Sequence, residues 1–380
     1  MATGTLVSSA PSVEQGELIT FTYTTPQSSV TPKNWVGLYS DPGGGPVDQS
    51  YVGPSTLWEY TPLATGTVSF STGSLGPGNY LAFYLANDGY AWLAEPVRFV
   101  VRPTPQTPPP VYQGAFGRSG PGPSQFSSPA GLTVDARGQV WVADTGNDRV
   151  QAFTRDGRLV RVLAGRFKAP QAVAVDHAGN VYVADTGNNR VVQYSWWGGF
   201  AREYGAGKLD NPRGVAIDTA GRLLVSDTGH QRVARFDTHT GKALTDITEK
   251  VSSPQGIVSD GAGGAWIVQN GRAASGSVAV VHYSGDGKAI GSIGGGQNSE
   301  FGGLSNPAGV ALNTQGDAYV TVPDYGWVAQ FRTTGPYRAE FGTDGPGALS
   351  FPLGVAVDAQ GRIFVADTGN DRIVHFGVRA

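Results

Sequence analysis

The chain has 380 residues, which is long for one ordinary domain and comfortable for two. Its 56 glycines, 25 prolines and 39% hydrophobic residues favour many short strands joined by tight turns, so we expect an all-β protein. The lack of cysteine excludes disulfides, thiolate metal sites and a cysteine nucleophile. Neither residues 1–110, with a net charge of −4, nor residues 111–380, with a net charge of +1, have the basic excess expected of a phosphate-tracking surface.

The sequence also carries no membrane or targeting signal. No apolar run approaches the roughly 20 residues of a membrane helix, and the first residues lack the basic and apolar layout of a signal peptide. The compartment stays undetermined, because an extracellular protein whose signal peptide has been removed would have the same sequence.

Residues 1–101 alternate short β-rich runs with turn signals, which predicts a small β-sandwich of roughly seven strands. Asn-Trp-Val-Gly-Leu-Tyr at 34–39, Leu-Gly-Pro-Gly-Asn-Tyr at 75–80 and the final strand at 97–101 carry a resemblance. This region resembles immunoglobulin-like or fibronectin-like accessory domains, especially the SKICH type and the N-terminal domain of purple acid phosphatases. The resemblance implies an appendage without catalytic residues.

Aromatic residues of this domain have two interpretations. Trp35, Trp58, Tyr90 and Trp92 either pack in the core and at the edges of the sandwich or form an aromatic platform for a sugar. The proline-rich segment 102–110 then reads as an extended, semi-rigid linker and marks the domain boundary.

From residue 111 to residue 380 one frame recurs, Pro-x-Gly-Val-Ala-Val-Asp-x-x-Gly, followed by a Val-Tyr-Val-Ala-Asp-Thr-Gly-Asn-x-Arg stretch in its clear copies. Its prolines, which number the units 1 to 6, are Pro129, Pro170, Pro212, Pro254, Pro307 and Pro352. The spacings of 41 to 53 residues match the period of a β-propeller blade. The units resemble NHL repeats, with units 4 and 5 degenerate, and the resemblance implies a six-bladed propeller.

The last unit ends too soon to contain its own outer strand. Residues 112–117 (YQGAFG) match residues 337–342 (YRAEFG), the predicted outer strand of unit 5. We therefore expect the N-terminal strand 112–117 to complete the last blade, which closes the ring and removes open sheet edges.

The recurring Asp-Thr-Gly-Asn-x-Arg resembles a row of catalytic carboxylates, but pairing explains it better. In units 1, 2, 3 and 6 each aspartate faces an arginine five residues later across a hairpin, as Asp185 faces Arg190, and units 4 and 5 lose both residues together. We predict structural, partly exposed pairs, each worth about a kcal/mol or less.

The variable residue of Pro-x-Gly begins each inner strand beside the predicted central channel. Gln171, Arg213 and Gln255 occupy it in three consecutive units and predict a site for an anionic or amide small molecule; the alternative is that they only solvate the channel mouth. Propeller lyases of similar fold place metal-binding histidines at this position, and no unit has one here. We predict no catalytic residues, no metal ligands and no cofactor.

The predicted propeller has two distinct faces. The irregular loops of units 4 and 5 lie on the top face, and we expect a partner to bind there through residues that stand out from the repeat: Asn270, Arg272, Asn298, Phe301, Tyr325 and Trp327. Trp196 and Trp197 lie in a loop of unit 2 on the bottom face and are predicted to contact the sandwich, because two adjacent exposed tryptophans are uncommon.

Three functions are compatible with these features. We favour a non-catalytic binding or scaffold protein whose propeller presents its top face to a protein, peptide or polymer; the near-neutral propeller disfavours nucleic acid. An extracellular lyase or hydrolase at the channel mouth is the first alternative, and a structural assembly subunit is the second. The fold alone does not choose among them.

Overall fold

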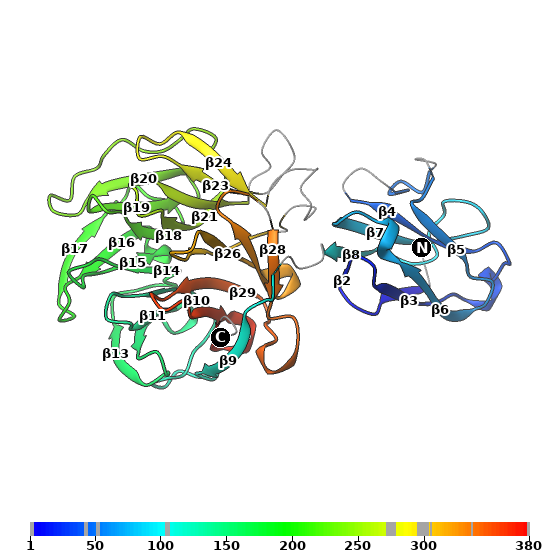
Figure 1. Ribbon diagram of the computed structural model, residues 1–380, viewed down its shortest axis with the longest axis horizontal. Helices are drawn as coiled ribbons and strands as arrows, with labels where there is room; N and C mark the ends of the chain where they lie inside the picture. The colour runs from blue at the N-terminus through cyan, green and yellow to red at the C-terminus, as the bar shows by residue number, and fades with distance from the viewer. Residues whose placement is uncertain are drawn as a thin grey trace. The chain divides into compact units, whose positions relative to one another are not determined.

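The computed structural model describes residues 4–41, 45–50, 54–102, 107–270, 279–294, 304, 306–335 and 337–377. The chain divides into two compact units, one within residues 4–102 and the other within residues 107–377. Each unit is described by itself below (Figure 1). Among the described residues, no helix is long and apolar enough to cross a membrane.

The first unit consists of two sheets with strand orders β1-β3-β6 and β2-β8-β7-β4-β5. The strands are β1 (Thr5–Ser8), β2 (Ser12–Glu14), β3 (Leu18–Thr24), β4 (Trp35–Ser40), β5 (Leu57–Tyr60), β6 (Thr65–Ser71), β7 (Gly78–Leu85) and β8 (Val97–Arg102). The alternating pattern of β3 buries Ile19, Phe21 and Tyr23, and these side chains share one core with Tyr84 and Phe99 of the other sheet. The described residues of this unit therefore form eight strands, where the sequence suggested about seven.

The second unit consists of successive antiparallel sheets, here called blades 1 to 6 after their repeat units. Blade 1 contains β10 (Pro129–Val134), β11 (Val140–Asp144), β12 (Arg149–Phe153) and β13 (Leu159–Ala164); blade 2 contains β14 (Ala172–Val175), β15 (Val181–Asp185), β16 (Arg190–Tyr194) and β17 (Phe200–Tyr204). Blade 3 contains β18 (Pro212–Ile217), β19 (Arg222–Asp227) and β20 (Arg232–Asp237), with isolated bridges from β20 to Ala243 and Ile247 in the place of a fourth strand.

The remaining blades follow the same order. Blade 4 contains β21 (Pro254–Ser259), β22 (Ala265–Gln269), β23 (Ala279–Tyr283) and β24 (Ala289–Ile293); blade 5 contains β25 (Val310–Leu312), β26 (Asp317–Val322), β27 (Trp327–Arg332) and β28 (Tyr337–Phe341). Blade 6 contains β29 (Pro352–Val357), β30 (Ile363–Asp367), β31 (Arg372–Gly377) and, as its fourth strand, β9 (Val111–Phe116). The all-β fold is thus confirmed.

The blades surround a common centre, which Figure 1 shows as the region where their first strands converge. Each first strand contacts that of the next blade, and β29 of blade 6 contacts β10 of blade 1. The predicted closing strand is present as β9, which pairs antiparallel with β31 through Phe116–Ile373 and Tyr112–Phe376. The chain's own first propeller strand therefore supplies the outer edge of its last blade.

A threonine hydroxyl links each regular blade to its neighbour. Thr145 donates to the carbonyl of Pro170 at 2.7 Å, and Thr186 and Thr228 repeat this contact with Pro212 and Pro254. Thr368 of blade 6 donates to Pro129 of blade 1 at 2.7 Å. The threonine that opens each of these turns therefore has a structural role, because its hydroxyl satisfies a backbone carbonyl at each junction between these blades.

The recurring aspartate–arginine pairs are present, but they are more buried than the sequence suggested. Asp144 and Arg149 are directly opposite in the β11–β12 ladder and lie 2.6 Å apart; the other regular blades repeat the geometry at 2.6 to 2.7 Å. All four aspartates are 0% exposed. The aspartates are thus more buried than predicted, because each carboxylate also accepts a backbone hydrogen bond from the loop before its blade, whereas the arginines of blades 2, 3 and 6 stay partly exposed as predicted. The energy of the pairs stays a prediction.

Candidate functional site

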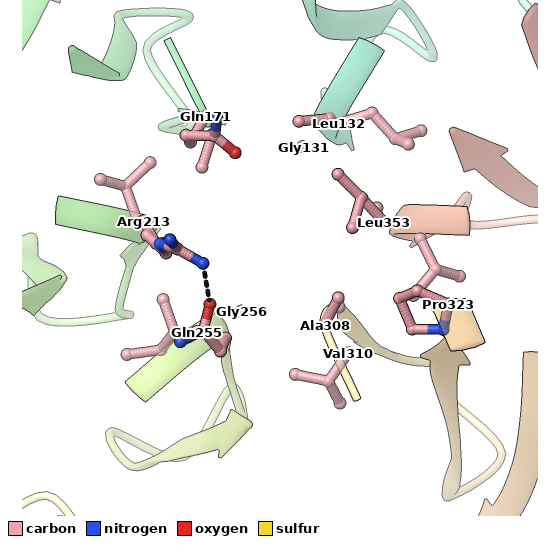
Figure 2. Close-up of a pocket in the computed structure, with 18 of the residues that line it drawn as sticks. Gly131, Leu132, Gln171, Arg213, Gln255, Gly256, Ala308, Val310, Pro323 and Leu353 are labelled. Atoms are coloured by element: carbon pink, nitrogen blue, oxygen red, sulfur yellow. Dashed lines mark hydrogen bonds between the residues drawn. The ribbon is translucent and has the colours of Figure 1, made fainter. Parts of the chain in front are cut away.

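The variable residues of the six Pro-x-Gly frames line one cavity of about 270 Å³ at the start of the inner strands. They are Ala130, Gln171, Arg213, Gln255, Ala308 and Leu353. Figure 2 shows Gln171, Arg213 and Gln255 on one side of the opening, with Leu132, Leu353 and Ala308 on the other. The cavity therefore has a polar half from blades 2 to 4 and an apolar half from blades 5, 6 and 1.

The glycine of the frame allows the inner strands to approach closely. A Cβ atom on Gly214 would lie 2.3 Å from the carbonyl oxygen of Gln255 in the next blade, and one on Gly354 would lie 2.3 Å from that of Ala130. Such a distance is far inside van der Waals contact, so any side chain would push the blades apart. Blade 2 has Ala172 instead, and its strand β14 lacks the register shift found in β10, β18, β21 and β29.

The polar half of the cavity is organised around Arg213. Its Nη1 donates to Oε1 of Gln255 at 3.0 Å, as Figure 2 shows. Gln255 is 8% exposed, and its Nε2 donates to the carbonyl of Ser253 at 3.1 Å, which fixes the amide orientation. The structure thus brings together the predicted Arg213 and Gln255 directly and places Gln171 on the same cavity wall.

Arg213 has no carboxylate partner within the described part of the chain. The cavity lining that the structure describes contains no aspartate or glutamate. The Arg213 side chain is exposed at the channel mouth. A guanidinium that is oriented by a buried amide and faces no counter-charge is suited to bind a carboxylate or phosphate.

The sequence analysis did not predict one feature of the cavity rim, the backbone conformation of the residue before each frame proline. The residue before each frame proline has a left-handed backbone, with φ between 45° and 52°, and these residues are Ser128, Ala169, Asn211, Ser253, Asn306 and Phe351. Five of them are small or polar, but Phe351 is bulky, 48% exposed and part of the cavity lining. A large side chain in this conformation is costly, so Phe351 is the rim residue that the scaffold explains least. The signal in the sequence is its departure from the small residues of the other units.

The predicted partner-binding residues are only partly brought together. Asn270 lines the cavity, and its Nδ2 donates to Oδ1 of Asn306 at 2.8 Å. Pro323, at the start of the predicted blade 5 loop, also lines the cavity. Arg272, Asn298 and Phe301 lie outside the described residues.

Trp327 differs from its predicted role as a surface residue. Its side chain is 1% exposed, and its ring stacks on Tyr325 with a centroid distance of 4.9 Å. The reason is its register: Trp327 opens β27 opposite Val322, where the regular blades hold the arginine that pairs with the buried aspartate. The expectation that the Trp327 ring lies on the surface was wrong, whereas Tyr325 remains partly exposed.

Trp196 and Trp197 are 53% and 65% exposed on blade 2. Their rings meet edge to face at 5.8 Å, and the Arg137 guanidinium lies 5.9 Å from the Trp196 ring. Arg161 donates to the carbonyl of Trp196 at 2.6 Å. Their contact with the N-terminal unit stays a prediction.

The cavity has side chains that can bind a ligand, but its described lining has few groups that can transfer a proton. Among its described lining residues none is histidine, lysine, tyrosine, aspartate or glutamate, the side chains that most often act as general acids and bases. Across the described residues, no group of three or more histidine, aspartate or glutamate side chains is placed to hold a metal ion. The usable chemistry is one guanidinium, several carboxamides and an apolar wall.

Comparison with known proteins supports this architecture. The NHL repeat model matches residues 126–153, 167–194, 209–236 and 349–376, which are blades 1, 2, 3 and 6. Human NHL repeat-containing protein 3 is 50% identical over 40 residues, which is 10% of this chain and 12% of that protein. This chain therefore covers only a small part of that relative.

Two solved structures align with almost the whole length of this chain. A Bacteroides thetaiotaomicron protein of unknown function has a TM-score of 0.55 at 14% identity, covering 99% of this chain and 98% of that one. Virginiamycin B lyase from Staphylococcus aureus has a TM-score of 0.50 at 13% identity, covering 96% and 100%. Such low identities establish the fold alone. The small radial sheets and these neighbours show a β-propeller fold for the second unit, and four of its blades match the NHL repeat.

Proposed function

We propose that this protein is a non-catalytic binding protein whose propeller captures a protein or peptide partner at the channel mouth, with a carboxylate of the partner bound by Arg213. The observation that carries the proposal is the exposed guanidinium that Gln255 orients and that no described carboxylate neutralises. A propeller of NHL repeats is a fold that commonly binds proteins.

The other lining groups suit the same kind of ligand. A peptide end presents a carboxylate, backbone amides and one side chain within a few ångströms. Arg213 matches the carboxylate, the carboxamides of Gln171 and Asn270 match the backbone, and the apolar half around Leu353 and Phe351 matches the side chain. The cavity of about 270 Å³ has room for a group of this size.

The test is a binding screen with immobilised decapeptides that have either free or amidated C-termini. Peptides that bind the intact chain are then titrated by calorimetry against wild type, Arg213→Gln and Arg213→Lys. Loss of a charge-assisted contact is expected to weaken binding about 10- to 100-fold in Arg213→Gln, with a smaller loss in Arg213→Lys. If the bound carboxylate is the C-terminal one, amidation should produce the same loss and add little in the variant.

Arg118→Gln is the matched control, because it removes an exposed arginine from the loop after the outer strand β9. Unchanged binding in Arg213→Gln would contradict the proposed site. The lyase fold neighbour makes a second readout necessary: mass spectrometry of the incubated peptides. Conversion that depends on the protein would refute the non-catalytic part of the proposal and favour the enzyme alternative.

A further inference from the structure

The N-terminal unit contains an aromatic pocket of about 230 Å³ that is separate from the propeller. Trp35, Trp58, Tyr60 and Tyr90 line it together with Asp88, Ser55 and Pro54. Trp92, which the sequence analysis grouped with these aromatics, packs elsewhere against Phe83 and donates its Nε1 to the carbonyl of Pro46. The pocket is thus a defined subset of the aromatic residues of this unit.

The rings of this pocket stand nearly perpendicular to one another. Trp35 meets Trp58 at an interplanar angle of 85° and Tyr90 at 79°, with centroid distances of 6.5 and 6.1 Å. Trp58 meets Tyr60 at 77° and 5.0 Å. Perpendicular neighbours form walls, whereas a sugar platform needs one open ring face parallel to the sugar ring.

The exposure of the rings differs along the pocket. Trp35 is 9% exposed, and its indole Nε1 donates to the carbonyl of Gly89, so this ring is a fixed wall of the pocket. Trp58 and Tyr60 are 53% and 42% exposed on β5, the edge strand of its sheet. The pocket therefore has a rigid inner wall and an accessible outer one.

The carboxylate beside the rings is held firmly. Asp88 adopts a left-handed backbone conformation with φ of 56°, and its N–H donates to the carbonyl of Lys33. Its Oδ1 accepts from the Tyr60 hydroxyl at 2.8 Å, and its Oδ2 lies 2.7 Å from Nζ of Lys33. The hydrogen bond from Lys33 and then that from Tyr60 lower the pKa of Asp88, so the carboxylate is ionised at neutral pH.

The N-terminal unit as a whole is negatively charged, as the Asp88 carboxylate is. Residues 1–104 contain three basic and seven acidic side chains, a net charge of −4, whereas the whole chain carries −3. A cation is therefore attracted to this unit before it reaches the pocket.

We propose that this pocket is a binding site for a quaternary or methylated ammonium group. Faces of tryptophan and tyrosine attract a cation through their ring quadrupoles, and methyl groups on the nitrogen make the cation large and weakly hydrated enough to fill a cage of perpendicular rings. The ring faces therefore provide the main attraction for the cation, because the Asp88 carboxylate at the edge of the cage is already paired with Lys33.

A neutral sugar fits the pocket less well. Sugar recognition needs several free hydrogen-bonding groups around the ring. Here both Asp88 oxygens already have partners, Lys33 and Tyr60, and the Tyr60 hydroxyl already donates its hydrogen bond to Asp88. The pocket thus offers more aromatic surface than hydrogen-bonding capacity, which favours the methylated cation.

The experiment titrates the intact chain by calorimetry with choline and with 3,3-dimethylbutan-1-ol, which has the same shape without the charge. Choline is expected to bind at least about tenfold more tightly, because only the cation interacts with the ring quadrupoles. Nε-trimethyllysine is likewise expected to bind more tightly than lysine, whose ammonium is compact and strongly hydrated.

Trp58→Ala is expected to weaken choline binding about tenfold or more, and Trp58→Phe less. Trp58 is exposed on an edge strand, so the fold should persist, which circular dichroism checks. Trp197→Ala, which removes an equally accessible tryptophan from the propeller, is the matched control and should bind as wild type does.

Four results would overturn the proposal: equal affinity for choline and its neutral analogue, no binding of choline, retention of choline binding in Trp58→Ala, or Trp58-dependent binding of cellobiose or N-acetylglucosamine in preference to choline. The last result would assign the pocket to neutral sugars. None of these outcomes depends on the channel mouth, so the two proposals are tested independently.

Discussion

Blades 1, 2, 3 and 6 and blades 4 and 5 reach the same architecture with different side chains. In blade 1, the buried Asp144 carboxylate accepts from the backbone N–H of Ser127 at 2.8 Å and from Arg149 at 2.6 Å. In blade 4, Gln269 holds the same place, and its Oε1 accepts from the N–H of Ser252 at 2.7 Å. In both blades the side chain at this position accepts a hydrogen bond from the loop between blades. Either a carboxylate oxygen or an amide oxygen can accept it.

Blade 5 departs further from the repeat. Val322 and Trp327 form an apolar cross-strand pair there, and the adjacent Thr321 accepts from the N–H of Gly309 and donates to the carbonyl of Leu353. These two contacts satisfy the backbone N–H of Gly309 and the carbonyl of Leu353 without an ion pair. The difference between the two groups shows that different side chains at this position are compatible with the blade fold.

The largest expected effect concerns the aspartate–arginine pair of the regular blades. Asp144→Ala leaves the Arg149 guanidinium buried without its carboxylate and removes the acceptor for Ser127, so we expect a loss of about 3 to 5 kcal/mol in the free energy of unfolding. Gln269→Ala in blade 4 removes only a neutral acceptor and should cost about 1 to 3 kcal/mol. Urea denaturation of both variants measures the difference.

Asp156→Ala controls for the loss of a carboxylate, because the Asp156 side chain is 89% exposed in a hairpin loop. It should change the free energy of unfolding by no more than about 0.5 kcal/mol. Equal losses in Asp144→Ala and Gln269→Ala would show that the charge of the regular pair has no special role.

The second prediction compares the inner strands of blades 2 and 3. Gly214→Ala places a methyl group 2.3 Å from the carbonyl of Gln255 and should destabilise the propeller by about 1 to 3 kcal/mol. It should also weaken ligand binding at the channel mouth, since Gln255 orients Arg213. Ala172→Gly, at the equivalent position of blade 2, should cost no more than about 1 kcal/mol.

Thermal unfolding and peptide calorimetry of the two variants provide the readouts. A larger loss of stability in Ala172→Gly than in Gly214→Ala would refute the steric explanation of the Pro-x-Gly frame.

The smallest expected effect concerns the rim. Phe351→Asn places at the left-handed position a residue that tolerates this conformation and that occurs there in blades 3 and 5 as Asn211 and Asn306. We expect a gain of about 0.5 to 1 kcal/mol in the free energy of unfolding, together with weaker binding of the peptide's side chain. Asn211→Phe is the reciprocal variant and should lose stability by a similar amount. A loss of stability in Phe351→Asn would show that the Phe351 ring contributes packing that outweighs its backbone strain.

Most of the propeller could be predicted from the sequence, because its signals are local and repeat. The frame prolines predicted where the inner strands begin, and the match between residues 112–117 and 337–342 predicted that β9 completes blade 6. The same repetition placed Gln171, Arg213 and Gln255 around one channel mouth, where the structure has them. Whether they bind a ligand there stays a prediction.

What could not be predicted depends on contacts between residues far apart in the chain. The burial of Asp144 depends on the loop before it, and that of Trp327 on the register of β26 and β27. The hydrogen bond from Asn270 to Asn306 joins two different blades. Alternation and spacing carry no information about which side chain a neighbouring blade covers.

The sequence by itself therefore determined the repeat, the order of the strands and the closure of the ring, because turn chemistry and period-2 alternation act over a few residues. Only the tertiary structure decided that Gln255 orients the Arg213 guanidinium, that Phe351 stands on the rim of the channel mouth and that four aromatic rings of the first unit line one pocket. Those features arise where separate strands converge, and the geometry of convergence is fixed by packing between elements rather than by any single stretch of the chain.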